Sequence, residues 1–183
     1  MITDLKSVRS FGPLLAMIGA MLSACSAMPG KPTFTQEQLP EAVRVPAGHS
    51  VALETVGVGQ ITYECRAKAG SVAAFEWVFV GPQATLSQRS GAAMGRYYGP
   101  PATWEAQDGS KVTGTQVAVA PATPGSIPLQ LVKANPAMGD GAMRAVSYIQ
   151  RVATQGGAAP MAPCEAQGVG RKEVVNYRAD YIF

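Results

Sequence analysis

The sequence predicts an all-β domain, either an antiparallel sandwich or a small barrel of short strands. Residues 61–66 and 175–183 alternate apolar and polar side chains with a period of two, as half-buried strands do. The chain contains 20 glycines and 14 prolines, which interrupt any long helical pattern. The pair Asp108-Gly109 separates two further strand-like runs and suits the tight turn of a hairpin. Many short strands at regular spacing are typical of sandwiches and small barrels.

The expected strands follow one another with turn residues between them. Residues 75–80 are apolar on both faces apart from Glu76, which is typical of a central strand. Residues 103–106 and 111–120 flank the Asp-Gly turn and form a hairpin. We also expect one short helix near residues 37–42. The full set of expected strands is 51–58, 61–66, 75–80, 84–86, 94–98, 103–106, 111–120, 127–132, 146–152 and 175–183.

The first 24 residues have the pattern of a signal peptide. Lys6 and Arg9 form a basic head, and the apolar run over 11–22 is too short to span a bilayer as a helix. Two small residues then lead to Cys25, an order that resembles a bacterial lipoprotein signal. We therefore expect residues 1–24 to be removed and Cys25 to carry the lipid, which makes the membrane a partner through an N-terminal anchor.

The alternative is an ordinary secretory signal that is cut near Ala27. In the lipoprotein interpretation, the residue after the lipidated cysteine is Ser26 and not Asp, which resembles the sorting pattern for the outer membrane. We then expect the protein to face the periplasm. Residues 25–42 are polar and contain proline, so we expect a flexible tether. Residues 43–183 have the length and composition of one domain, which we expect to be the single all-β domain.

After lipidation, Cys65 and Cys164 remain. Two remaining cysteines in an exported chain predict a disulfide between them. The alternation of apolar and polar residues around Cys65 turns this side chain inward. The alternative is two separate buried thiols, because free cysteine behaves as a small apolar residue.

The charges exclude one class of partner. The net charge is +3, and no cluster of lysine and arginine stands out, so we expect no nucleic-acid binding. His49 is the only histidine, which disfavours a zinc site or a Ser-His-Asp triad. The chain has no Gly-x-Ser-x-Gly elbow, no phosphate-binding glycine loop and no dinucleotide fingerprint. We therefore predict no cofactor, no metal and no catalytic residue.

Two carboxylates could still supply an acid and a base for the hydrolysis of an envelope carbohydrate. On the strands, however, Glu64 and Asp180 alternate with apolar neighbours, as residues of a solvent-facing surface do. The candidates for such a pair are Glu54, Glu64, Glu76, Glu105, Asp108 and Asp180.

The candidate ligand-binding surface is aromatic. Tyr97, Tyr98 and Trp104 fall within one stretch bounded by glycine and proline, and Trp77 could approach them. Tyrosine and tryptophan offer flat apolar area with a polar group, which suits sugars, peptides or lipid head groups. The competing interpretation places both tryptophans in the core. Since neighbouring residues on a strand point to opposite faces, we expect one of the two tyrosines to be exposed.

Several linked motifs resemble the bacterial and fungal family called domain of unknown function 3455. Members are exported or lipid-anchored and are expected to be β-rich, with no established activity to carry over. One departure is that relatives tend to have His-Tyr where this chain has Tyr97-Tyr98, so any role of that histidine is absent here. The motifs lie at 45–54, 59–65, 104–112, 148–152, 156–157, 164 and 177–183.

These observations predict a lipid-anchored envelope protein that binds or scaffolds a carbohydrate, peptide or protein without catalysis. The alternatives are the carboxylate hydrolase and a purely structural envelope protein.

Overall fold

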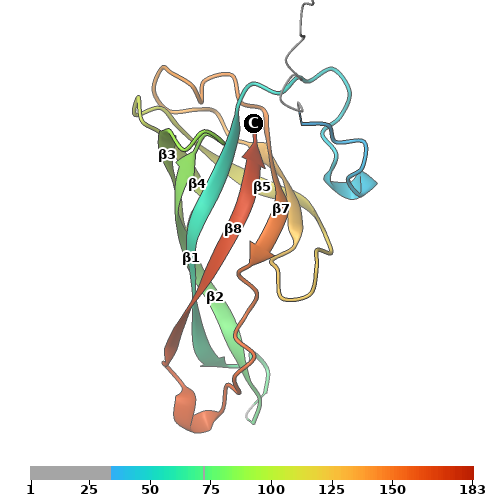
Figure 1. The fold of residues 1–183 in the computed structure, drawn as a ribbon. Helices are drawn as coiled ribbons and strands as arrows, with labels where there is room; N and C mark the ends of the chain where they lie inside the picture. Colours follow the sequence, from blue (N-terminus) through green and yellow to red (C-terminus); the bar gives the residue numbers. More distant parts are fainter. Residues whose placement is uncertain (1–33, 72) are drawn as a thin grey trace, which may run out of the picture. The chain divides into compact units, whose positions relative to one another are not determined.

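The computed structural model describes residues 34–71 and 73–183, and in these ranges eight antiparallel strands form a closed barrel (Figure 1). Each strand pairs with its neighbour in the sequence, and the last strand pairs with the first. The strands are β1 (Glu54–Ala67), β2 (Phe75–Ser87), β3 (Ala93–Tyr98), β4 (Thr103–Ala106), β5 (Lys111–Ala120), β6 (Leu129–Ala134), β7 (Tyr148–Gly156) and β8 (Lys172–Ile182). The all-β prediction is confirmed, and of its two forms the chain adopts the barrel.

Two pairs of predicted strands are in fact single long strands. The ranges 51–58 and 61–66 merge into β1, and 75–80 and 84–86 merge into β2. The expected gap at residues 59–60 is part of β1, and a Cβ at Gly59 would overlap the carbonyl oxygen of Gln83 on β2. Glycine therefore allows a close approach of two strands here.

The barrel core is aromatic at one end. The rings of Tyr97 and Trp104 stack with their centroids 4.8 Å apart, and Tyr181 lies 5.1 Å from Tyr97. The hydroxyl groups of Tyr177 and Tyr181 form a hydrogen bond of 3.1 Å inside the barrel. These four rings fill inward positions of three strands, β3, β4 and β8, as side chains do in other small barrels.

Strands β1 and β2 extend beyond β3 as a long hairpin, which β8 accompanies (Figure 1). Near its end, Cys65 and Cys164 form the expected disulfide, with an S–S distance of 2.02 Å, and Cys65 is fully buried. The Trp77 indole N–H donates to the carbonyl of Ala162 at 2.8 Å. The connection between β7 and β8 is thus fastened to the hairpin by one covalent bond and by hydrogen bonds.

Residues 34–45 lie against the outside of β5, β6 and β7, and we call them the N-terminal strap. Val43 is fully buried there against Leu131, within the short 3₁₀ turn η1 (Glu41–Val43) that replaces the expected helix at 37–42. The buried Gln150 amide donates to the carbonyl of Val43 at 2.6 Å. The part of the predicted tether that the structure describes, 34–42, is therefore packed on the barrel.

Candidate functional site

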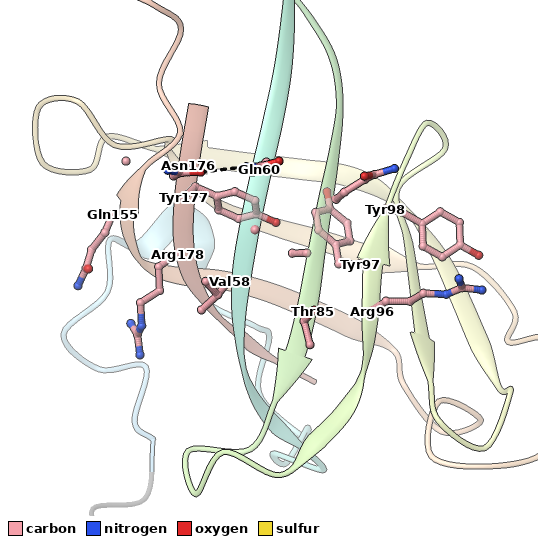
Figure 2. Close-up of a pocket in the computed structure, with 14 residues that line it drawn as sticks. Val58, Gln60, Thr85, Arg96, Tyr97, Tyr98, Gln155, Asn176, Tyr177 and Arg178 are labelled. Carbon is pink, nitrogen blue, oxygen red and sulfur yellow. Dashed lines mark hydrogen bonds between the residues drawn. The ribbon is translucent and has the colours of Figure 1, made fainter. Parts of the chain in front are cut away.

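An open groove of about 1150 Å³ crosses the outside of five neighbouring strands, β7, β8, β1, β2 and β3 (Figure 2). The lining includes exposed side chains at outward positions, such as Val58 and Gln60 on β1, whereas Ile61 on the same strand faces the core. It also includes the core residues Ala84, Tyr97 and Tyr177. The groove therefore follows from the alternation of the strands and from the curvature of the barrel wall.

Amide side chains are the main polar groups of the groove. Gln60 and Asn176 face each other on paired strands, and the Gln60 amide donates to Asn176 Oδ1 at 3.3 Å (Figure 2). Gln83 and Gln155 also line the groove. A bulge between Val152 and Gln155, at which Ala153 has a φ of 48°, positions Gln155 at the β7 side.

At the β3 side, Arg96 and Tyr98 are held by one carboxylate of the next strand. Arg96 contacts both oxygens of Glu105, at 2.9 and 3.1 Å, and the Tyr98 hydroxyl donates to the same carboxylate at 2.7 Å. The guanidinium lies 5.1 Å from the centre of the Tyr98 ring. The hydrogen bond from Tyr98, together with Arg96, holds the pKa of Glu105 below its usual value, and it raises the pKa of Tyr98.

At the β8 side, Arg178 lies 3.4 Å from Asp180, whose other oxygen accepts a hydrogen bond of 2.7 Å from Arg89. Arg89 also lies 3.5 Å from Glu54. Two arginines and two carboxylates thus form one network, and their charges cancel. Asp180 is buried within it, although the strand alternation predicted a solvent-facing position.

A family model described as "Protein of unknown function (DUF3455)" matches residues 46–183. The chain belongs to the DUF3455 family. This confirms the resemblance that the sequence motifs indicated. No curated protein and no solved structure shows a significant match to the chain.

The structure of this DUF3455 chain separates the predicted aromatic residues. Trp104 is only 1 % exposed, and Tyr97 is also buried, so both rings belong to the core. Tyr98 is half-buried and lines the groove. Trp77 lies near the disulfide, where the guanidinium of Arg171 is 5.1 Å from its ring, and it does not join the other three. Of the four, Tyr97 and Tyr98 are among the residues that line the groove, and Tyr98 is the more exposed of the two.

The six predicted carboxylates of the DUF3455 chain do not gather in a cleft. None of them is among the described residues that line the groove. Glu54 and Asp180 share Arg89, whereas Glu64 pairs with Arg66 at 3.1 Å on the hairpin. A hydrogen bond from Arg66 lowers the pKa of Glu64. Hydrogen bonds from the Ser110 side chain and from backbone N–H groups lower the pKa of Asp108. Glu76 is exposed.

Within residues 34–71 and 73–183, no three His, Cys, Asp or Glu side chains come together as a metal site. His49 lies next to the strap, where its ring packs edge-on against Tyr148. In the same part of the chain, no helix is long and apolar enough to cross a bilayer. Cys25 and Ser26 lie outside the described residues.

Sequence reasoning missed the amides Gln60, Gln83, Gln155 and Asn176. A partial signal existed, because Gln60 and Asn176 occupy outward positions of alternating strands. What the sequence lacks is the pairing that brings these strands side by side.

Proposed function

We propose that the protein is a lipid-anchored binding module of the bacterial cell envelope that holds a carbohydrate in the groove. The observation that carries this proposal is the amide-rich lining, with Gln60, Gln83, Gln155 and Asn176 spread over four strands. A primary amide both donates and accepts hydrogen bonds, and so does a sugar hydroxyl. The groove therefore matches a ligand that is rich in hydroxyl groups.

Binding without catalysis is the better account of this groove. Hydrolysis of a glycosidic bond by the usual route needs an acidic and a basic carboxyl group on either side of the bond. The described lining offers amides, arginines, three tyrosines and small apolar groups instead. Glu105, the carboxylate beside the groove, has its pKa lowered, which is the wrong direction for a general acid.

The proposed anchor is the lipidated Cys25, in the outer membrane and facing the periplasm. The strap begins at Phe34, whose backbone N–H donates to Glu54 at 3.2 Å. Nine residue steps from Cys25 to Phe34 reach at most about 30 Å when extended. The variant Cys25→Ser is expected to abolish the incorporation of labelled fatty acid; incorporation at the wild-type level would refute the anchor.

The binding proposal is tested by co-sedimentation of the full chain with insoluble envelope polysaccharide. We expect Gln60→Ala/Asn176→Ala to weaken binding about tenfold, because each lost hydrogen bond contributes about 0.5–1.5 kcal/mol. The matched control is Gln116→Ala/Gln130→Ala, a hydrogen-bonded amide pair (2.6 Å) on β5 and β6, away from the groove. Equal binding by wild type and groove variant, or no binding by the wild type, would contradict the proposal and favour a purely structural envelope protein.

A further inference from the structure

We infer that the groove takes a linear, uncharged glycan of N-acetylated amino sugars that lies across the strands. This inference rests on the proposed function and names its ligand. It follows from three features of the groove: its charge balance, the position of one exposed valine, and its extent across the sheet.

The charges of the groove are already paired within the protein. Arg96 is held by Glu105 at 2.9 and 3.1 Å, and Arg178 lies 3.4 Å from Asp180. An anionic ligand would have to compete with these carboxylates for the guanidinium groups. The amides carry no charge and remain able to bind, so an uncharged ligand fits better.

An aliphatic side chain lies beside the central amides. Val58 is 56 % exposed, and it is two residues from Gln60 on the same face of β1. Across the sheet, Val58 pairs with Arg178, and Gln60 pairs with Asn176. An acetamido group carries a methyl group next to an amide that donates and accepts. Val58 can contact that methyl, while Gln60 and Asn176 hydrogen-bond the amide.

The groove is longer than one sugar ring. It crosses β7, β8, β1, β2 and β3 in that order, from Gln155 at one side to Tyr98 at the other. Four steps between neighbouring strands, at about 4.8 Å each, give a span of about 19 Å. Polar groups lie along the whole span (Figure 2). A chain of several rings would therefore make more hydrogen bonds than a single sugar.

The test is calorimetry on the full chain with defined oligosaccharides. The probes are β-1,4-linked N-acetylglucosamine from monomer to hexamer, and the corresponding glucose oligomers, which lack the acetamido group. We expect the acetylated hexamer to bind at least about tenfold more tightly than its monomer and than the glucose hexamer, as about two additional net hydrogen bonds would give. Raising the salt concentration should change this affinity by less than about twofold, because no charge pair forms.

Val58→Ser is expected to reduce the preference for the acetylated hexamer over the glucose hexamer at least threefold. The matched control is Val119→Ser, at a valine that is 46 % exposed on β5, outside the groove. Equal affinity for monomer and hexamer, or for the acetylated and glucose forms, would overturn the inference. If the hexamer does not bind while envelope polysaccharide still depends on Gln60 and Asn176, this inference fails and the proposed function stands. If polysaccharide binding is also independent of these amides, both fail.

Discussion

Removing the disulfide between Cys65 and Cys164 should destabilise the domain, but the connection between β7 and β8 should stay docked on the hairpin of β1 and β2. The two cysteines are 99 residues apart in the sequence, so the disulfide closes a large loop in the unfolded chain. In the chain-entropy model, a loop of this size corresponds to about 4.7 kcal/mol at 25 °C. For a domain of 150–250 residues, this equals a fall in Tm of roughly 10–20 °C.

The variant for this test is Cys65→Ala/Cys164→Ala, compared with the wild type by urea unfolding and circular dichroism without reductant. We expect a loss of about 3–5 kcal/mol. The connection should stay docked in the folded state, since the Arg171 carbonyl accepts from the Cys65 N–H at 2.9 Å and the Ala162 carbonyl accepts from Trp77 at 2.8 Å. Reduced wild type should match the variant. A fall in the free energy of unfolding of less than about 1 kcal/mol, with an unchanged m-value, would refute the argument that the disulfide acts by lowering the entropy of the unfolded chain.

Three further predictions concern stability. Glu105→Gln should show a smaller fall in Tm than the wild type when the pH is lowered below 4.5. The pKa of Glu105 is lowered from 4.5, mainly by the Tyr98 hydrogen bond. The contribution of this carboxylate to the free energy of unfolding is therefore present above pH 4.5 and is lost as the pH falls through the folded-state pKa. An equal fall in wild type and variant would contradict this. Ala153→Gly should raise the free energy of unfolding, measured in urea, by about 0.5–1 kcal/mol. Glycine relieves the strain of the left-handed backbone conformation at this residue, and this gain exceeds the added entropy of the unfolded chain. A less stable variant would contradict this. Gly57→Ala should lower the free energy of unfolding by about 1–3 kcal/mol, because the new Cβ would lie 2.5 Å from the buried ring of Tyr181. An unchanged melting temperature would contradict this.

The strand pattern was predictable wherever local chemistry decides it. Residues 103–106 and 111–120 form β4 and β5 as predicted, because the Asp-Gly turn fixes their hairpin. The expected gaps at 59–60 and 81–83 contain Gly59 and Pro82, and glycine and proline are depleted in strands. In the barrel they lie within β1 and β2, where Gly59 permits a close approach. Pro82 pairs with Ile61, near the register shift between Thr62 and Tyr63. Only the tertiary pairing distinguishes these uses from a turn.

The candidate site was less predictable than the fold. Tyr98 was identified, but Trp104 was expected at the same surface and lies in the core, because inward and outward positions of β3 and β4 depend on the register of their pairing. The central amide pair depends on β1 lying beside β8, which brings together Gln60 and Asn176 from distant parts of the sequence. No local pattern encodes that proximity.

The pairing of the first strand with the last has a consequence for the order in which the barrel assembles. Until Lys172–Ile182 (β8) is in place, β1 and β7 each keep an unpaired edge, and the wall that carries the groove lacks the strand between them. The barrel therefore closes through a contact between strands that are far apart in the sequence, and such long-range pairings are slow to form during folding.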